Sequence, residues 1–519
     1  MKTKTTLIFL IAFSLLTSSC GENEIISSST SNTISASTST SEIKPDESLI
    51  QFFVDSDVYY SCKILKGEKA RKPQDPFKVG YTFQRWVNED GTLWDYDKVI
   101  TVDTYNIYAE FEYDFLEVPA IIINTDEKQE ITSKENYTSS KVSIANTNEE
   151  WQLNELSAGV RLRGYSSSWH YPKKSYRIKF NKKQSVLGSS YKAKSWTLIA
   201  NHCDKTLLRN YIAYEFGSRF AGIDFSPKHN IVELYLNDDY KGVYLLCDQV
   251  QTGTGRVNID ESVAEDGNNG FLLERDGHEH PGETLDQDYF FFHDEDYVIK
   301  TPDTETDEYV ANKEVEVNYI KNYMQSCWDA ITSGTWGEVN DLIDMDSFVD
   351  SYILDELFAN TDCGFSSCYY YKDKNGKLFK GPPWDFDTGA GNLDFNTVIG
   401  DETECPPDTG LYADQANAWY KHLWTRPEFI DCVKDKMSSN ASIIADVIAL
   451  LDMTNENNLY SLHKNAMDRN FVRWDIMGIY IWPEPITIYS LSTISDQMTY
   501  FHDWLQLRYN FMNDTFAAL

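Results

Sequence analysis

The sequence predicts a large α+β domain with two lobes, preceded by a small β module and an N-terminal targeting segment. Strand-like runs dominate the region from residue 115 to about residue 276. Helical patterns then take over, and a β-hairpin at 360–392 interrupts them. The length of 519 residues suits two or three domains, and the 14% aromatic content indicates a well-packed body.

The N-terminus carries the features of an export signal. Lys2 and Lys4 precede the apolar run 7–16, which is too short to span a bilayer. The small residues before Cys20 resemble the lipobox of bacterial lipoproteins, which implies that Cys20 is lipidated after cleavage of residues 1–20. An ordinary secretory signal is the alternative, because Leu16 lies four residues before the cysteine instead of three. We expect an exported protein, held by its lipid alone at the outer face of the bacterial cell membrane.

A tether and a small module follow this signal. Residues 21–47 are dominated by Ser and Thr and predict a flexible segment that buries too little apolar surface to fold. Residues 48–113 alternate in the manner of β-strands and resemble an internalin-B-type (Listeria–Bacteroides) repeat, a β-grasp-like module. The marks of that repeat are Gly67-Glu68, Pro76, Gly80-Tyr81-Thr82-Phe83, Trp86 and Ile107-Tyr108-Ala109-Glu110-Phe111.

The main domain is expected to span 115–519. Its predicted strands are the runs VPAIIIN, GVRLRG, KSYRIKF, WTLIAN, NIVELYLN, GVYLLCDQV and GFLLERD, which are rich in β-branched and aromatic residues. Apolar residues at helical spacing predict helices over Val315–Ser333 and Asp346–Asn360, the second with an Asp cap. Further helices are expected within 410–452 and 496–516.

The hairpin is the segment most directly tied to chemistry. The run CYYYKD, the turn Lys-Asn-Gly and the run KLFKGPPW predict two strands with Asp362 before the first and Asp385 after the second. Two carboxylates at the two ends of one hairpin can meet at one site, as phosphoryl transfer requires. Magnesium takes one or two protein carboxylates together with phosphate oxygens. The alternative is that both aspartates are turn residues and helix caps.

Composition and other motifs exclude several classes of protein. The net charge of −35 disfavours binding to nucleic acid or to anionic lipid. The eight cysteines after Cys20 form no Cys-x-x-Cys pair, so we expect no zinc site and mostly free thiols. No Gly-x-Ser-x-Gly or His-Glu-x-x-His motif occurs. His278 and His280 in RDGHEHPGE offer a metal site, but an exposed loop is the favoured interpretation.

Several blocks in order resemble the spore-coat protein H (CotH) kinase family of atypical protein kinases, over roughly 115–430. They are Arg163-Gly164, Pro172-Lys173-Lys174-Ser175-Tyr176, Trp196, Leu198, Asn201, Asp204-Lys205, Leu208-Arg209-Asn210, Leu236-Asn237, Gly242-Val243-Tyr244, Gly270-Phe271-Leu272-Leu273-Glu274, Asn360-Thr361-Asp362 and Pro383-Trp384-Asp385-Phe386-Asp387. The resemblance implies a bilobal kinase-like fold, ATP with Mg²⁺ or Mn²⁺ as cofactors, and transfer of the γ-phosphate to Ser or Thr. The expected partner is a surface or secreted protein, and the sequence indicates no oligomeric state.

The resemblance also implies roles for individual residues. Asp362 is expected to be the catalytic aspartate that orients the acceptor hydroxyl, and Asp385 the magnesium ligand. Lys174 is expected to pair with the ATP phosphates, with Lys173 as the fallback.

The chain departs from the family pattern at two positions. Ser367 stands where many members have a metal-binding Asn and is expected to be a weaker metal ligand, with Asp387 or Asn392 as its substitute. Asp248 stands where the family has a Glu that is placed to pair with the lysine, and its reach is shorter by one methylene.

Three other functions stay open, and the two departures favour the first. One alternative is a surface-anchored binding or structural protein whose kinase domain has lost catalysis. Another is adenylylation or glutamylation on the same scaffold. A retaining glycosidase that uses Asp362 and Asp385 is a third reading, but it leaves the strand of Lys173 and Lys174 without a role.

Overall fold

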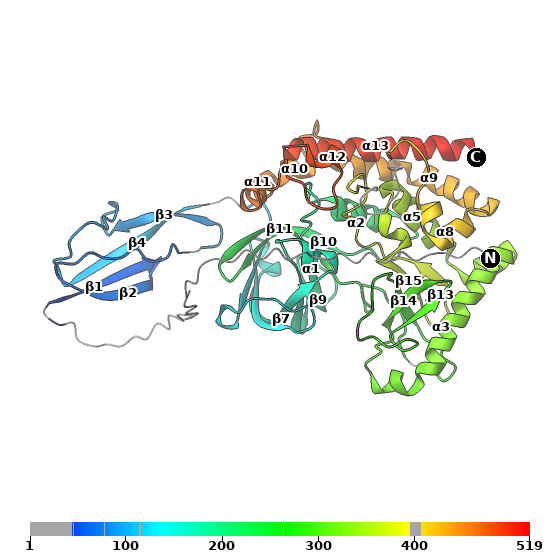
Figure 1. Cartoon of the computed structure of the whole chain (residues 1–519), viewed down its shortest axis with the longest axis horizontal. Coiled ribbons are helices and arrows are strands. Elements are labelled where there is room, and N and C mark those ends of the chain that lie inside the picture. The colour runs from blue at the N-terminus through cyan, green and yellow to red at the C-terminus, as the bar shows by residue number, and fades with distance from the viewer. Residues whose placement is uncertain (1–43, 45, 77, 114–115, 263, 395–405) are drawn as a thin grey trace, which may run out of the picture. The chain divides into compact units, whose positions relative to one another are not determined.

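The computed structural model describes residues 44, 46–76, 78–113, 116–262, 264–394 and 406–519 (Figure 1). The chain divides into two compact units, one made of residues 1–73 and 87–108 and the other of 74–86 and 109–519. The predicted signal, Cys20 and all but the end of the tether lie outside the described residues. No helix in the described ranges has both the length and the apolar character that a membrane crossing requires.

The segment with the predicted repeat folds as a four-stranded sheet in the order β2-β1-β4-β3. Its strands are β1 (Glu47–Val54), β2 (Asp57–Leu65), β3 (Tyr81–Asn88) and β4 (Thr104–Tyr113). Strand β1 is antiparallel to β2 and parallel to β4, so both parallel and antiparallel ladders occur in one small sheet. The β content agrees with the alternation in the sequence, while the identity of the repeat stays a prediction.

The first part of the main domain is a closed barrel of seven strands in the order β10-β11-β9-β8-β7-β6-β5. The strands are β5 (Ala120–Thr125), β6 (Thr138–Ala145), β7 (Leu153–Arg163), β8 (Ser175–Gln184), β9 (Ala193–Ile199), β10 (His229–Leu236) and β11 (Asp239–Asp248). Parallel pairing of β5 with β10 closes it. Alternate apolar side chains such as Ile123, Val160 and Ile178 fill the interior, as the two-residue period of a strand requires.

The second part contains a five-stranded sheet in the order β13-β14-β12-β15-β16. Its strands are β12 (Phe271–Arg275), β13 (Tyr289–Phe292), β14 (Glu295–Thr301), β15 (Cys368–Lys372) and β16 (Leu378–Lys380). Strands β15 and β16 are antiparallel, which confirms the predicted hairpin. Strand β12 is antiparallel to β15 with Arg275 opposite Cys368, so the end of β12 and the start of β15 share one edge.

Helices complete the domain and share one large apolar core with this sheet. The longer ones are α2 (Arg209–Arg219), α3 (Asp307–Ser333), α5 (Met345–Phe358), α9 (Pro427–Ile448), α11 (Lys464–Arg473) and α13 (Ile494–Ala518). The shorter ones are η1 (Asp126–Lys128), η2 (Glu149–Trp151), α1 (Ser166–His170), α4 (Trp336–Leu342), η3 (Thr361–Gly364), α7 (Ala413–Ala416), α8 (Ala418–Leu423), η4 (Ala449–Leu451), α10 (Leu459–Leu462) and α12 (Ile486–Tyr489).

The predicted helices are present, with differences at their starts. Helix α3 begins eight residues before Val315, at Asp307, because Thr306 caps it there by accepting a hydrogen bond from the Tyr309 amide. The cap of α5 is Asp344 instead of Asp346, since the Asp344 side chain accepts from the Ser347 amide. The mixed α+β class is therefore confirmed.

The cysteines in the described ranges are free thiols: Cys62, Cys203, Cys247, Cys327, Cys363, Cys368 and Cys432. This agrees with the expectation of unpaired cysteines, and Cys405 lies outside the described residues.

Candidate active site

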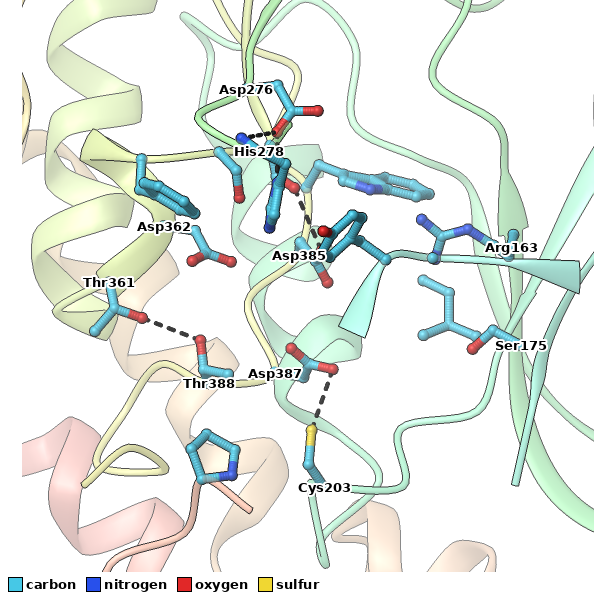
Figure 2. Close-up of a pocket in the computed structure, with 18 of the residues that line it drawn as sticks. Arg163, Ser175, Cys203, Asp276, His278, Thr361, Asp362, Asp385, Asp387 and Thr388 are labelled. Atoms are coloured by element: carbon cyan, nitrogen blue, oxygen red, sulfur yellow. Dashed lines mark hydrogen bonds and ion pairs between the residues drawn. The ribbon is translucent and has the colours of Figure 1, made fainter. Parts of the chain in front are cut away.

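The hairpin places Asp362 and Asp385 on the wall of one cavity of about 720 Å³, together with Asp387 (Figure 2). Asp362 lies in the short helix η3, directly before β15, and its amide donates to the capping side chain of Asn360. Asp385 follows β16 and has a left-handed backbone with φ of 64°. Asp is one of the few side chains that accept this conformation, which turns the carboxylate into the cavity.

The three carboxylates are close enough to oppose one another's ionisation. Burial raises the pKa of Asp362 well above its usual range, and the charges of Asp385 and Asp387 raise it further. Burial also raises the pKa of Asp385, while the nearby Arg163 guanidinium opposes that rise. Burial and the charge of Asp385 raise the pKa of Asp387 to about 7. A cluster of this kind is stabilised in its ionised form by a bound cation.

Two basic side chains also line the cavity, Arg163 at the end of β7 and Lys300 on β14. The Arg163 guanidinium lies 5.1 Å from the ring centre of Trp384, next to Asp385 in the chain. Lys300 forms an ion pair with Glu274 at 3.0 Å. The cavity therefore combines acidic groups that suit a metal with basic groups that suit phosphate.

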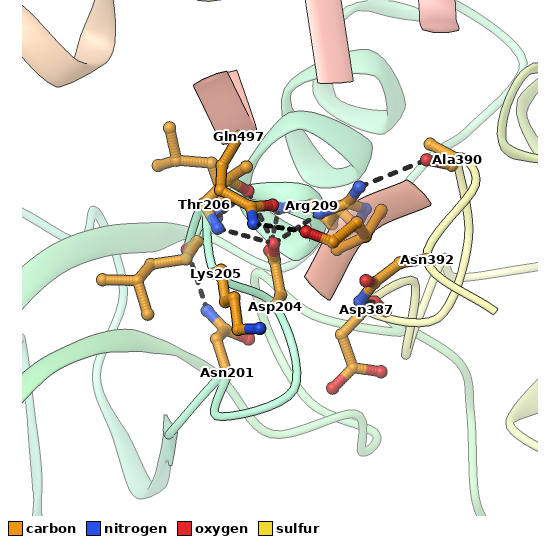
Figure 3. Close-up of polar contacts among 12 residues, drawn as sticks. Asn201, Asp204, Lys205, Thr206, Arg209, Asp387, Ala390, Asn392 and Gln497 are labelled. Carbon is orange, nitrogen blue, oxygen red and sulfur yellow. Dashed lines mark hydrogen bonds and ion pairs between the residues drawn. The ribbon is translucent and has the colours of Figure 1, made fainter. Parts of the chain in front are cut away.

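Residues of the Asp204–Asn210 segment hold the loop after the hairpin in place (Figure 3). The Asn210 side-chain oxygen accepts from the Phe386 amide at 2.7 Å. Arg209 donates to the carbonyl oxygens of Gly389 (3.0 Å) and Ala390 (3.2 Å), and its own charge is paired with Asp204 at 2.6 Å, both side chains being fully buried. These bonds fix the backbone on either side of Asp387.

Cys203, in the cavity wall, and the buried Asn392 both contact Asp387. The Asn392 amide nitrogen donates to the carbonyl oxygens of Asp387 (2.7 Å) and Cys203 (3.0 Å), and the Cys203 thiol donates to the Asp387 carboxylate at 3.4 Å. The Asn392 side-chain oxygen is buried without a hydrogen-bond partner. Asn392 itself does not line the cavity.

The structure does not bring Lys173 and Lys174 to the aspartates. Lys173 is buried, and its ammonium donates to the Val243 carbonyl (2.5 Å) and the Asn470 side chain (2.9 Å). The Lys174 ammonium donates to the Ser168 carbonyl at 2.9 Å. Ser175 lines the cavity, whereas its neighbour Lys174 does not. Arg163 and Lys300 are the basic residues that occupy the cavity wall.

Asp248 also has partners other than those expected. Its carboxylate forms an ion pair with Arg256 at 2.7 Å and accepts from the Tyr191 hydroxyl and the Lys228 amide. It pairs with neither lysine, because β11 ends in a turn that brings Arg256 back over it. Ser367 does lie in the cavity wall, where its hydroxyl donates to Asp385 at 3.3 Å.

A histidine–aspartate pair in this cavity was read from the sequence as part of an exposed loop. The His278 ring nitrogen lies 2.5 Å from the Asp276 carboxylate, and Figure 2 shows the ring pointing toward Asp362 and Asp385. The pair reaches the cavity because β12 ends beside the start of β15. Since that pairing is long-range, the only local signal was the position of Asp-Gly-His directly after a strand.

The residues fit a single divalent cation held together with phosphate. In the ranges that the structure describes, no three His, Cys, Asp or Glu side chains form a metal site by themselves. Magnesium, however, uses only one or two carboxylates when phosphate oxygens complete its shell. Asp385 and Asp387 supply those carboxylates, whereas Asn392 contacts Asp387 through its amide nitrogen and lies outside the cavity lining.

Comparison with known proteins gives the family. The family model described as CotH kinase protein matches residues 160–512, which is more than half of the chain. The chain therefore belongs to the CotH kinase family, and its function is kinase-like at the level of that family. No curated protein matches the chain.

Proposed function

We propose that this protein transfers the γ-phosphate of ATP to a Ser or Thr hydroxyl of a surface or secreted protein, with Mg²⁺ or Mn²⁺ as cofactor. The observation that supports it is the convergence of Asp362 and Asp385, from the two ends of one hairpin, on a single cavity. The barrel would form the first lobe of a bilobal kinase-like domain, and the helices with the five-stranded sheet the second.

Each part of the cavity has a role in this proposal. Asp385 and Asp387 hold the cation, which neutralises charge on the phosphates when it is bound. Asp362 orients the acceptor hydroxyl for attack in line with the departing ADP. Arg163 and Lys300 bind phosphate oxygens from the opposite side. Lys174, to which the family resemblance gives this role, lies outside the cavity lining, and its contact with phosphate stays an untested prediction.

Apolar side chains in the cavity wall suit a nucleobase. Ile199, Leu393 and Pro483 are among the lining residues. His202, also in the lining, is buried with both ring nitrogens unpartnered, and burial lowers its pKa to about 3. A neutral imidazole of this kind can exchange hydrogen bonds with a purine without a cost in charge.

Three substitutions test the proposal. Asp385→Asn should abolish metal-dependent nucleotide binding, because the amide lacks the charge that holds the cation. Asp362→Asn should leave binding intact and remove transfer, since orientation of the acceptor matters only in the chemical step. Asp435→Asn, an exposed aspartate on α9, is the matched control and should change neither. The ATP affinities of Arg163→Ala and Lys174→Ala identify which of the two basic side chains binds the phosphates.

Labelled ATP and mass spectrometry of an acceptor mixture separate the chemistries. A gain of one phosphate supports the kinase, and a gain of AMP supports adenylylation. Ser367 keeps a second candidate open, because its neutral hydroxyl replaces a stronger metal ligand and already donates to Asp385. If the wild-type protein binds no ATP with either metal, the surface-binding function replaces the kinase.

Export and anchoring are part of the same proposal. Cys20→Ser should move the protein from the membrane fraction to the soluble exported fraction. Retention of the variant in the membrane would contradict lipid anchoring.

A further inference from the structure

Four basic side chains lie on the outer face of two neighbouring barrel strands and form what we call the basic stripe: Arg161 and Arg163 on β7, and Arg177 and Lys179 on β8. The residues between them face inward, since Val160, Leu162, Ile178 and Phe180 belong to the barrel core. The alternation of a strand therefore places all four cations on one surface.

The pairing register brings these cations together. Arg161 is directly opposite Arg177, while Arg163 is opposite Ser175 and Lys179 is opposite Gly159. Like charges directly opposite each other on a sheet are destabilising. The arrangement therefore costs stability unless an anion lies over it.

No carboxylate of the described residues forms an ion pair with the stripe, although Arg163, at its cavity end, is near enough to Asp385 and Asp387 to lower the pKa of both. Within the ranges that the structure covers, none of the four cations forms an ion pair, although the protein carries a net charge of −35. The more deeply buried Arg209, Arg256 and Arg508 are each paired with a carboxylate. The missing partners are thus a property of this surface and not of the arginines in general.

Arg161 and Arg177, which face each other, also have hydrogen-bond donors that lack acceptors. The Nε atoms of Arg161 and Arg177 are buried without a hydrogen-bond partner. Burial lowers the pKa of Arg177, and the charges of Arg161 and Arg163 lower it further, against an opposing contribution from Tyr137. The Tyr137 ring lies 5.1 Å from the Arg161 guanidinium and 5.6 Å from the Lys179 ammonium, so it orders the cations without neutralising them.

The stripe begins at the active-site cavity and leads away from it. Arg163 and Ser175 line that cavity, whereas Arg161 and Arg177 do not. Each step of two residues along a strand adds about 7 Å. At the far end, Tyr137 and Gly159 line a second hollow of about 430 Å³, whose other lining residues are Asp126, Ser139, Ser140, Lys141, Ser157, Ala158 and Asn181. Apart from Asp126, its polar groups are neutral or basic.

We propose that the basic stripe binds an anionic group on the acceptor polypeptide, a phosphoserine or phosphothreonine in first preference, beside the hydroxyl that is to be phosphorylated. This inference rests on the proposed function and specifies its substrate class: an acceptor that already carries phosphate. Two arginine forks that face each other match the several oxygens of a phosphate better than the two of a carboxylate. The nucleotide is a poorer occupant, because Arg161 and Arg177 lie beyond the cavity that its phosphates would fill.

Peptide binding measured by fluorescence anisotropy without nucleotide tests this inference directly. The probes are labelled peptides with a central Ser, flanked on one side by phosphoserine, by Glu or by unmodified Ser. Charge-assisted hydrogen bonds to two arginines should give the phosphoserine peptide at least about tenfold tighter binding than the neutral peptide. Arg161→Gln with Arg177→Gln should remove this difference. The matched control, Lys377→Gln with Lys421→Gln, removes two exposed positive charges elsewhere and should preserve it.

Two further arms identify the ligand and guard against misfolding. Equal affinity for the Glu and phosphoserine peptides would support an anionic acceptor polypeptide and identify its anionic group as a carboxylate. Arg161→Lys with Arg177→Lys keeps the charge and loses the forks, so it should still prefer anionic peptides but bind phosphoserine no better than Glu. Equal affinity of the folded wild type for all three peptides would overturn the inference, as would weaker ATP binding with unchanged peptide binding in the double Gln variant. Because peptide binding is measured without nucleotide, that measurement is independent of whether the protein proves to be a kinase.

Discussion

Replacing Asp387 by Asn should stabilise the protein at neutral and alkaline pH. Folding raises the pKa of this carboxyl from 3.8 to about 7, through burial and the charge of Asp385. The folded state therefore binds more protons than the unfolded state between these pH values, and stability falls as the pH rises through this window. Above pH 7 the Asp387 carboxylate is ionised in both states, and the folded protein bears the full loss of stability from burying its charge. The uncharged amide of Asp387→Asn avoids this loss.

The size of the effect follows from the same values. A rise from 3.8 to about 7, at about 1.4 kcal/mol for each pH unit, corresponds to about 4 kcal/mol. Asp387 is only half-buried and shares its environment with Asp385, so we expect about half of this, about 2 kcal/mol at pH 8. The difference should shrink as the pH falls and vanish below about pH 4, where both states are protonated.

Urea unfolding of wild type and Asp387→Asn at pH 5, 6, 7 and 8 measures this difference. Asp435→Asn is the control and should give a stability difference that does not depend on pH. Added Mg²⁺ with nucleotide should stabilise wild type and not Asp387→Asn, because ligands that bind only the folded state shift its stability. A variant that is no more stable than wild type at pH 8 would refute the reasoning from burial and charge.

Three other outcomes are expected. Lys205→Met should lower the free energy of unfolding in urea by about 3 kcal/mol, because it leaves the buried Glu484 without its ion-pair partner at 2.8 Å. Adding Glu484→Gln should restore part of this loss. A Lys205→Met variant as stable as wild type would contradict the reasoning. Asn210→Ala should lower the free energy of unfolding by about 2 kcal/mol and weaken nucleotide binding, since the Phe386 amide loses its hydrogen-bond acceptor. Unchanged nucleotide affinity would show that this hydrogen bond does not hold the loop after the hairpin. His278→Ala should lower the transfer rate about tenfold and leave nucleotide affinity unchanged, because the His278 ring faces Asp362 on the acceptor side. Labelled ATP measures both quantities. A change in nucleotide affinity alone would show that His278 contacts the nucleotide instead.

Local sequence patterns predicted much of the fold. The runs that became β5, β7 to β12 and the β15–β16 hairpin are rich in β-branched and aromatic residues, and their type was correct. Strands β6, β13 and β14 were missed, and in β6 the sequence TSSKVSIA mixes polar residues into the alternation. Closure of the barrel could not be predicted, since the pairing of β5 with β10 depends on residues far apart in the chain.

The candidate site was predicted in part for similar reasons. Asp362 and Asp385 belong to one hairpin, so local pattern was enough to bring them together. The position of Lys174 depends on which face of the chain near β8 turns to the cavity, and a shift of one residue reverses the answer. His278 reaches the site only because β12 pairs with β15, and Asp248 meets Arg256 only through the turn after β11.

The closed barrel has a consequence for how the chain reaches its native state during synthesis. One of its closing strands, β5, is the first of the barrel to be made, and its partner β10 comes near the end. A chain that is made from its N-terminus presents β5 with an open edge until β10 arrives. Ladders between distant segments form slowly, and unpaired edges invite association with other chains. The protein should therefore depend on assistance during the interval between these two strands, and truncation before β10 should yield aggregates instead of a smaller folded piece.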